Sequence, residues 1–192
     1  MIRPRIRTTG FTVIELLTVV AIAALLAVIA APSFTEFLAK RRVEGTMAEL
    51  VTDIQYARSE AVSRNAPVRM TFGTGCYAIH LASASATAST CAISPVSAEI
   101  KTVLIDTTRV FLKPVDSLTH FEFDPVRGMA SNDSSPAGSG RVEVCIRNAA
   151  GTDCGTAATA WRLAAVLTVM GRVETCSPSG AGHFSGYSSG CS

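Results

Sequence analysis

A carboxylic acid stands inside the most apolar stretch of this sequence. Glu15 lies in the run from Phe11 to Ala31, whose other members are apolar except for Thr12 and Thr18. A carboxylate near one end of a helix that crosses lipid costs on the order of 1–3 kcal/mol unless it finds a partner or water. Glu15 is therefore either an interfacial side chain that reaches the lipid headgroups, or a functional group that pairs with a nearby cation.

Six cysteines are the other residues with distinctive chemistry, and their number is even. In an exported domain such a set indicates disulfides, whereas in a reducing cytosol it indicates metal binding. A metal site is the weaker interpretation because the chain has no Cys-x-x-Cys and its histidines are scattered. Among the fifteen pairings that six cysteines allow, the short loops and the strand–turn context favour Cys76–Cys91, Cys145–Cys154 and Cys176–Cys191. The last pair would tether a Gly/Ser-rich tail that otherwise has little apolar burial to support its order.

No group of residues has the pattern of a catalytic centre. The three histidines each stand alone, and three aspartates lie in turn-like contexts where Asp commonly hydrogen-bonds to its own backbone. These residues are His80, His120, His183, Asp106, Asp116 and Asp124. No Gly-rich loop followed by Lys-Ser or Lys-Thr is present to hold a nucleotide. We therefore expect a protein that is not an enzyme and that needs neither a cofactor nor a metal.

The composition indicates a membrane anchor joined to one domain. The chain has 192 residues, of which 48% are hydrophobic and only 17% charged, and its mean hydropathy is +0.34. These values are too apolar for a plain soluble domain, so we expect part of the chain to lie in lipid. The formal net charge of +2 gives no polyelectrolyte argument for nucleic acid.

The run from Phe11 to Ala31 is long enough to cross a membrane, since as a helix it would be roughly 30 Å long. A secretory signal peptide is disfavoured because no clear small-x-small cleavage site follows the run. A buried core helix is disfavoured by the length of the run and the basic residues before it. Charge counting leaves the orientation open, because one basic trio precedes the span and another follows it. These residues are Arg3, Arg5, Arg7, Lys40, Arg41 and Arg42. The cysteines favour a C-terminal domain outside the cytoplasm.

After the apolar run, the helical pattern continues as an amphipathic segment to about Arg64. Pro32 should kink the helix and loosen its hydrogen bonds locally, and Asn65-Ala66-Pro67 should end it. Polar residues such as Asp53 and Arg58 are expected on the other faces. The apolar residues recur mostly at three- and four-residue steps, which predicts a stripe that packs under a sheet. They are Phe34, Phe37, Leu38, Met47, Leu50, Val51, Ile54, Ala57, Ala61 and Val62.

The rest of the chain changes to the two-residue alternation of strands. The predicted strands are Val68–Phe72, Cys76–Leu81, Glu99–Ile105, Thr108–Leu112, Thr119–Phe123, Arg141–Arg147 and Ala160–Met170. Between them, Ala82–Thr90 is almost wholly Ala, Ser and Thr, which is typical of a surface loop. No repeat or second domain is evident in the sequence.

The segment Gly10-Phe11-Thr12-Val13-Ile14-Glu15-Leu16-Leu17 resembles the cleavage and methylation motif of type IV prepilins and type II secretion pseudopilins. The resemblance implies that a prepilin peptidase cuts between Gly10 and Phe11, and that the new Phe11 amine is then N-methylated. It also implies that Glu15 offers its carboxylate to the Phe11 amine of a neighbouring subunit during filament assembly. A cation and an anion that are each costly in lipid cost less as a pair.

Two later segments are similar to the GspH/FimT group of minor pseudopilins. The first is the helix end Arg58-Ser59-Glu60-Ala61-Val62-Ser63-Arg64-Asn65 with Pro67. The second is Leu167-Thr168-Val169-Met170-Gly171-Arg172-Val173 with Cys176. These segments favour this group over the major pilins.

One departure from the group concerns DNA. Some FimT-like members are DNA receptors for natural transformation and carry Gly-Arg-x-Arg in the late turn. Here the turn is Gly171-Arg172-Val173-Glu174, so a carboxylate replaces the second arginine and one phosphate contact is lost. Arg172 is a candidate DNA contact only in this weaker alternative, in which other arginines would have to lie nearby. The candidates are Arg141, Arg147 and Arg162.

Together these features predict an α+β fold, in which a long N-terminal helix packs against a C-terminal antiparallel β-sheet domain, as in pilins. The helix would have a transmembrane half and an amphipathic half. The expected organisation is a prepilin leader at 1–10, a transmembrane and assembly helix at 11–31, its amphipathic continuation at 32–66, and a periplasmic β-rich domain at 67–192.

The resemblance implies a minor pilin or pseudopilin at or near the tip of a type II secretion pseudopilus or a type IV pilus. Such a subunit helps to initiate filament assembly, and thereby protein secretion or pilus function. Its partners would be other pilin subunits, the prepilin peptidase and methylase, the inner-membrane assembly platform and the membrane itself, with DNA as the alternative partner. Its location would be the inner membrane, spanned once, with the C-terminal domain in the periplasm until assembly.

Overall fold

The computed structural model describes residues 11–87, 90–132, 140–148, 150, 152–155, 160–180 and 182–191, apart from the side chains of Pro32 and Asn132. Leu38 ends the first of two compact units, and Ala39 begins the second. One helix, α1 (Val13–Arg64), contributes to both units. The predicted leader, residues 1–10, lies outside the described residues.

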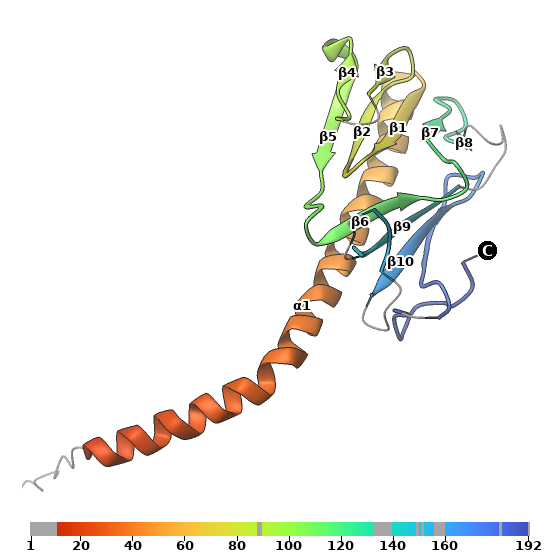
Figure 1. Ribbon diagram of the computed structural model, residues 1–192. Coiled ribbons are helices and arrows are strands. Elements are labelled where there is room, and N and C mark those ends of the chain that lie inside the picture. Colours follow the sequence, from red (N-terminus) through yellow and green to blue (C-terminus); the bar gives the residue numbers. More distant parts are fainter. Residues whose placement is uncertain are drawn as a thin grey trace, which may run out of the picture. The chain divides into compact units, whose positions relative to one another are not determined.

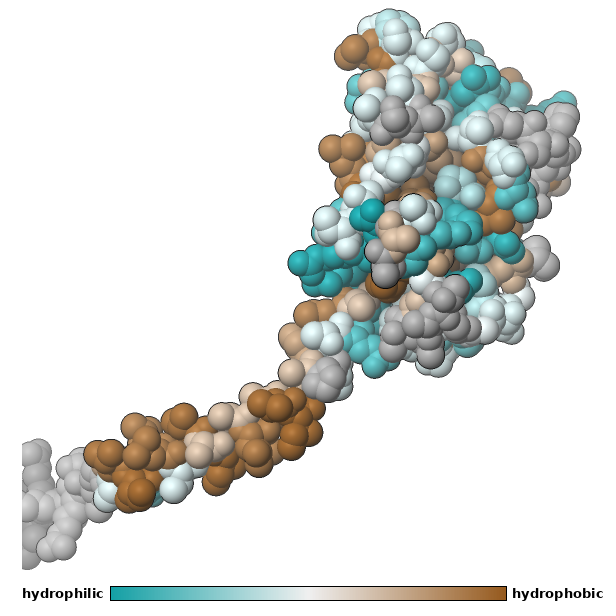
Figure 2. Space-filling model, viewed as in Figure 1, coloured by the Kyte–Doolittle hydropathy of each residue, from teal (hydrophilic) through white to brown (hydrophobic). Residues whose placement is uncertain are grey.

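The first unit is the apolar beginning of α1. Val13–Ala31 is 19 residues long, has a mean hydropathy of 2.8 and buries none of its length. It is the one helix in the described part of the chain that is long and apolar enough to cross a membrane. Figure 2 shows a predominantly hydrophobic surface over this segment. A helix that is apolar on all sides cannot keep its surface in water, so this segment requires lipid or other protein around it.

The second unit is built around the later turns of α1. Six of its apolar residues follow one another at steps of four and three residues and are almost completely buried: Val43, Met47, Leu50, Ile54, Ala57 and Ala61. This spacing keeps them on one face of the helix. The prediction of an amphipathic segment is thus confirmed. The residues of the stripe differ in part from those predicted. Val43 belongs to it, whereas Phe34, Phe37 and Val62 are 62%, 51% and 54% exposed.

A five-stranded antiparallel sheet packs on this stripe. Its strand order is β5-β2-β1-β7-β8. The strands are β1 (Val68–Gly73), β2 (Cys76–Leu81), β5 (Glu99–Leu104), β7 (His120–Phe123) and β8 (Ala130–Asn132). A small hairpin, β3 (Ser85–Ala86) with β4 (Ile93–Ser94), and the 3-10 helix η1 (Val96–Ala98) lie between β2 and β5 in the chain.

A second, four-stranded sheet has the order β11-β10-β9-β6. Its strands are β6 (Val110–Pro114), β9 (Gly140–Ile146), β10 (Arg162–Leu167) and β11 (Val173–Cys176), and all of their pairs are antiparallel. Figure 1 shows the later turns of α1 running behind strands of both sheets. Buried residues of the helix and of both sheets form one hydrophobic core, so the predicted fold class is confirmed.

The strand alternation explains why two strands are buried on both faces. In β2, Tyr77 and Ile79 face the main core, whereas Cys76 and Ala78 face a second cluster with residues of the β3–β4 region. In β10, Leu163 faces the main core, and Ala164 faces a third cluster that includes Cys176. Successive side chains of a strand point to opposite faces, so each of these strands needs a cover on its outer side.

The sequence pattern missed several short elements. β3 lies inside the segment Ala82–Thr90, which was predicted to be a loop, and β8 and β11 were not predicted as strands. The late strand is also shorter than the predicted Ala160–Met170, because Gly171 N donates to Thr168 O (2.8 Å) and closes a turn. Strands of two to four residues give too few alternations to be recognised by period.

The C-terminal tail corrects one expectation. We predicted little apolar burial for this Gly/Ser-rich segment, but Phe184 is completely buried. Its ring contacts Trp161 and Tyr187 edge-on, with centroids 5.2 Å and 5.9 Å away. Lys40 Nζ of α1 lies 4.9 Å from the Trp161 ring and 5.1 Å from the Phe184 ring, which is cation–π distance. One aromatic residue thus fixes the tail to the helix.

Candidate assembly and processing site

The predicted processing site lies at the start of the described chain. Gly10 is outside the described residues, whereas Phe11 is described and is 81% exposed. Phe11 and Thr12 precede the first turn of α1. Cleavage between Gly10 and Phe11 and methylation of the Phe11 amine stay predictions.

Thr12 caps the helix, and Glu15 occupies its first turn. The Glu15 backbone N–H donates to Thr12 Oγ1 (3.3 Å), and Leu16 N–H donates to Thr12 O (3.1 Å). The first bond is one half of a Thr-x-x-Glu capping box. In the complete box, the carboxylate of the Glu also accepts a hydrogen bond from the backbone N–H of the Thr. The sequence analysis missed this cap, although the spacing of Thr12 and Glu15 is its usual signal. The helix therefore starts directly after Thr12, at Val13, and its N-terminal dipole favours an anion in the first turn.

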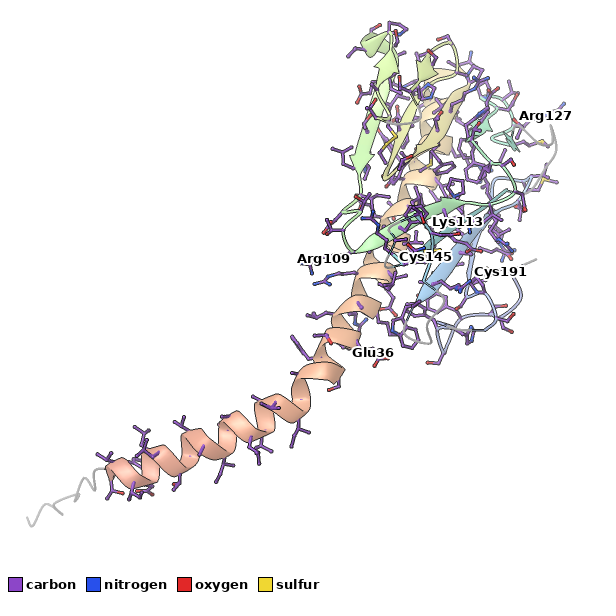
Figure 3. The ribbon with its side chains drawn as sticks, viewed as in Figure 1. Glu36, Arg109, Lys113, Arg127, Cys145 and Cys191 are labelled. Atoms are coloured by element: carbon purple, nitrogen blue, oxygen red, sulfur yellow. A yellow bond between two sulfur atoms is a disulfide. The ribbon has the colours of Figure 1, made fainter. Side chains whose placement is uncertain are left out.

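The Glu15 carboxylate lies on an exposed apolar surface. Its neighbours Ile14 and Leu16 are 67% and 61% exposed, and Figure 3 shows the side chains of this segment pointing away from the helix axis. The hydrogen bonds that the described chain gives to Glu15 involve its backbone groups only. A carboxylate on such a surface can form an ion pair with a cation from another molecule. The pair stabilises the carboxylate most in lipid, where an unpaired charge is most costly.

The helix continues without interruption through position 32. Proline within a helix lacks one backbone donor, so local loosening is expected there. The kink that we predicted at Pro32 stays a prediction.

An ion pair with a buried carboxylate joins α1 to the five-stranded sheet. Asp53 is only 4% exposed. Its Oδ2 accepts a hydrogen bond from Tyr77 Oη (2.8 Å), and both of its oxygens lie 2.7 Å from Lys101 Nζ. Burial, together with the Asp53 hydrogen bond and charge, raises the pKa of Tyr77 well above its usual value. We expected Asp53 on a face away from the apolar stripe, but its side chain is buried against the sheet and fixes the helix to β2 and β5.

All six cysteines form disulfides, in the pairs that the sequence analysis favoured. Cys76–Cys91, Cys145–Cys154 and Cys176–Cys191 have Cα–Cα distances of 6.1, 5.5 and 5.5 Å. The first fastens the β3–β4 region over the outer face of β2, and the third fastens the tail over the outer face of β10. These two disulfides therefore hold covers over the outer faces of β2 and β10.

The two segments that are similar to the GspH/FimT group meet in the structure. Arg58 Nη1 of α1 donates to Gly171 O (3.4 Å), in the turn between β10 and β11. Gly128, in the turn between β7 and β8, lies on the other side of this guanidinium. A Cβ at Gly128 would lie 2.9 Å from Arg58 Nε, and one at Gly171 would lie 2.6 Å from Gly128 O. Arg58, which we also expected on a face away from the apolar stripe, is half-buried under these two turns.

Arg172 follows directly, with its side chain 76% exposed, and Arg172 Nη2 lies 3.3 Å from Glu174 Oε1. The carboxylate that replaces the second arginine thus neutralises the first. Arg162 pairs with Cys145 at the opposite end of the β9–β10 ladder, so it is not near Arg172. Arg147 lies just beyond β9 at that same end, and donates to Thr107 O. Arg141 is at the nearer end, where Arg141 Nη1 donates to Cys191 O (3.1 Å) and Nε lies 3.4 Å from Glu143.

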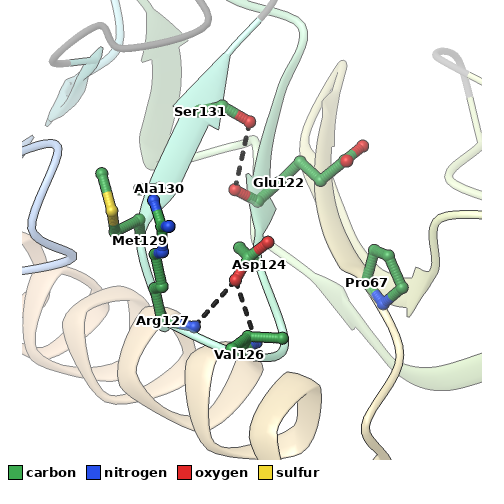
Figure 4. A pocket seen from close by; sticks show the side chains of 8 residues that line it. All are labelled: Pro67, Glu122, Asp124, Val126, Arg127, Met129, Ala130 and Ser131. Atoms are coloured by element: carbon green, nitrogen blue, oxygen red, sulfur yellow. Dashed lines mark hydrogen bonds between the residues drawn. The ribbon is translucent and has the colours of Figure 1, made fainter.

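Two of the aspartates in turn-like contexts, Asp124 and Asp106, accept hydrogen bonds from nearby backbone N–H groups. Asp124 Oδ1 accepts from the backbone N–H groups of Val126 (2.9 Å) and Arg127 (2.8 Å), and Figure 4 shows these bonds at the edge of a shallow pocket. Asp106 Oδ1 accepts from Thr108 N–H (3.1 Å). Among the described residues, no three His, Cys, Asp or Glu side chains lie together as metal ligands would.

This combination defines a class of protein. An exposed apolar helix with a carboxylate in its first turn continues into the core of a disulfide-fastened β-domain, which is the architecture of a pilin-like filament subunit. The exposed helix fits the single-pass inner-membrane anchor of a pilin. The model of the family described as type II transport protein GspH matches residues 46–165. The chain therefore belongs to the GspH family and is a GspH/FimT-like minor pseudopilin; the family consists of structural pilins.

Solved structures agree in fold. Two crystal structures of the type IV minor pilin FimU from Pseudomonas aeruginosa (strain PAO1) are similar to this chain. In one crystal form the identity is 18% and the TM-score 0.50, over 72% of this chain and 98% of FimU. In the other the identity is 16% and the TM-score 0.53, over 76% of this chain and 98% of FimU. The comparison with curated proteins found no match.

Proposed function

We propose that this chain is a minor subunit at or near the tip of a type II secretion pseudopilus or a type IV pilus, where it helps to initiate filament assembly. Membership of a pilin family implies association with other pilin subunits in a filament. In this role it would depend on a prepilin peptidase, a methylase and an inner-membrane assembly platform.

The observation that carries the proposal is the exposed segment Val13–Ala31, in which Glu15 is the one charged residue. In the bilayer, lipid covers this segment. In a filament outside the bilayer, the helices of other subunits have to cover it instead, because apolar area of this size is unfavourable in water. A methylated Phe11 amine on a neighbouring subunit is the cation that would compensate Glu15 in either place.

The disulfides support a periplasmic position for the domain. Three of them close within residues 76–191, and disulfides persist in the periplasm but not in a reducing cytosol. The orientation of the span follows from this, since the domain is joined to its C-terminal end.

Glu15→Ala tests the role of the carboxylate in assembly. The variant is expected to reach the membrane and to be cleaved, but to be largely absent from sheared filaments, because its ion-pair partner is lost. Glu36→Ala is the matched control, since Glu36 is also an exposed glutamate of α1 but lies outside the apolar segment. Normal incorporation of Glu15→Ala would contradict the proposal.

The number and the length of filaments separate initiation from elongation. If the chain helps to initiate assembly, its deletion lowers the number of filaments per cell, and those that form have normal length. A deletion strain with a normal number of filaments would contradict an initiating role. Electron microscopy of the deletion strain and the complemented strain gives both quantities.

A DNA receptor is the second function that the family resemblance raises, and the geometry argues against it. Arg172 is paired with Glu174, and of the three arginines considered as neighbours only Arg141 lies at the near end of the ladder. Gel shifts with the purified chain at low salt test this alternative, because electrostatic DNA binding is strongest there. Binding that Arg172→Gln abolishes would favour the receptor.

A further inference from the structure

A hollow of about 530 Å³ lies beside α1 and is lined by three arginines. Arg42 comes from the helix, Arg109 from the turn before β6, and Arg147 from the residue after β9. Figure 3 shows Arg109 projecting from the domain beside α1. Three cations that come from distant parts of the chain are thus brought to one concave surface.

The hollow carries no carboxylate among its described lining residues; its polar members are Thr108 and Asn148. A neighbouring hollow shares Arg42 and Arg109 and does contain Glu49 and Asp106. The Asp106 carboxylate is, however, already engaged. Thr108 Oγ1 and Thr108 N–H donate to it, and Arg109 Nε lies 3.6 Å away. Hydrogen bonds from Thr108 and then the charges of Arg109 and Arg42 hold the pKa of Asp106 below its usual value.

The deepest of the three arginines is held in place. Arg147 Nη1 donates to Thr107 O, and Arg147 is half-buried, whereas Arg42 and Arg109 are exposed. Arg147 Nε is buried and has no hydrogen-bond partner in the described chain. A positioned guanidinium loses less entropy when it binds a ligand than a free one does, and its planar donors match the oxygens of phosphate or carboxylate.

We propose that the hollow formed by Arg42, Arg109 and Arg147 binds the phosphate of an anionic phospholipid headgroup while the subunit is anchored in the membrane. The position of the hollow in the chain favours a membrane lipid as the source of the phosphate. Arg42 follows Ala31, the last residue of the apolar segment, by eleven residues of unbroken helix. At a rise of 1.5 Å per residue, its Cα is at most about 17 Å from that end.

This length of helix limits how far the hollow can lie from the membrane surface. Lys40 is adjacent and adds positive charge to the same stretch of α1, whereas Arg41 Nη1 pairs with Glu44 Oε2 (3.0 Å). Basic residues near a membrane surface attract anionic lipids, and the attraction falls off within a Debye length. The bound headgroup would hold the domain at the bilayer before assembly and would be released when the subunit leaves for the filament. The proposal does not depend on a position at the filament tip.

Native mass spectrometry of the full chain in a neutral detergent tests the proposal. The chain is presented with equal amounts of phosphatidylglycerol and phosphatidylcholine, and the retained lipids are counted. The wild-type chain is expected to retain phosphatidylglycerol in preference. In the variant Arg42→Gln/Arg109→Gln/Arg147→Gln, the ratio of retained phosphatidylglycerol to phosphatidylcholine is expected to be about tenfold lower, because three cations near the headgroup are removed.

The matched control is Arg64→Gln/Arg127→Gln/Arg172→Gln, which removes the same charge from three exposed arginines outside the hollow. This control is expected to keep the wild-type preference, and circular dichroism checks that both variants are folded. Equal loss in the two variants, or no preference in the wild type, would overturn the proposal. Two competition arms identify the source of the phosphate. Binding of inorganic phosphate, or of an oligonucleotide, through the same three arginines without any preference for phosphatidylglycerol would also overturn it.

Discussion

Arg58 Nη1 donates to the carbonyl oxygen of Gly171 at 3.4 Å, across 113 residues of sequence. Arg58 is on α1, and Gly171 is in the turn between β10 and β11. Both belong to segments that are similar to the GspH/FimT group, and this bond brings the two segments into contact. The turn lies directly on the helix, and Gly128 O occupies the space where a Gly171 side chain would be.

Gly171→Ala should destabilise the domain by about 2–3 kcal/mol, because two costs add. Its φ of +72° is strained for alanine, and the new Cβ would lie 2.6 Å from Gly128 O. Denaturant unfolding measures the change.

Substitutions at two other glycines distinguish the cost of backbone strain from the cost of the contact with Gly128 O. Gly180 has a φ of +106° but open space around it, so Gly180→Ala should cost only the backbone strain, about 1–2 kcal/mol. Gly45 lies within α1 with nothing near its Cβ position, so Gly45→Ala should stabilise by about 0.5–1 kcal/mol. Equal effects of Gly171→Ala and Gly180→Ala would show that the contact with Gly128 has no energetic importance.

Asp53→Ala should destabilise the domain by about 2–3 kcal/mol, because it leaves the Tyr77 hydroxyl and Lys101 without their partner. Tyr77→Phe removes one hydrogen bond only and should cost about 1 kcal/mol. Glu49→Ala is the control, since Glu49 is an exposed acid one helical turn earlier, and it should have almost no effect. If Asp53→Ala behaved like Glu49→Ala, the ion pair would not fix the helix to the sheet.

His80 should make the stability of the domain fall at mildly acidic pH. Burial lowers the pKa of His80, and its ring bonds Thr71 Oγ1 (2.9 Å) and Leu81 O (2.8 Å). Because the folded pKa lies below the unfolded one, the stabilisation is complete above the unfolded value of about 6.5. It is lost as the pH falls below that value, since the unfolded chain then binds the proton more readily.

NMR titration of the His80 ring measures its pKa directly. The midpoint of denaturant unfolding, followed from pH 7.5 to pH 5, should decline less steeply in His80→Gln than in the wild type. An unperturbed His80 titration would contradict the buried, neutral ring.

Removal of the third disulfide should free the tail. The double variant Cys176→Ser/Cys191→Ser opens a loop of 15 residues and should cost about 3 kcal/mol. The Phe184 contacts would be weakened with it, so proteolysis after residue 176 should become faster while the rest of the domain stays protected. Mass spectrometry of the non-reduced, digested chain should find all three pairs; six free thiols would contradict the structure.

Local patterns predicted much of this fold. The stripe from Met47 to Ala61 follows from helical spacing alone, and the end of α1 follows from Pro67, which disfavours helix in the residue before it. The disulfide pairs could be proposed because each closes a short loop. These features depend on residues that are close together in the chain.

The remaining features depend on contacts between distant residues. Nothing around Lys101 indicates that it reaches Asp53, and a single Phe184 in a Gly/Ser-rich tail gives no period to recognise. The hollow of Arg42, Arg109 and Arg147 likewise exists only because three separate elements meet. Such sites need the folded arrangement, since each residue alone looks like an ordinary surface cation or a lone aromatic.

The most direct test of the central claim is the intact mass and N-terminal sequence of the protein recovered from membranes. If the chain is a filament subunit of this family, the mature protein begins with N-methylated Phe11 and lacks residues 1–10. A protein that still begins with Met1, in cells with an active prepilin peptidase, would contradict processing as a prepilin and with it the proposed role in a filament.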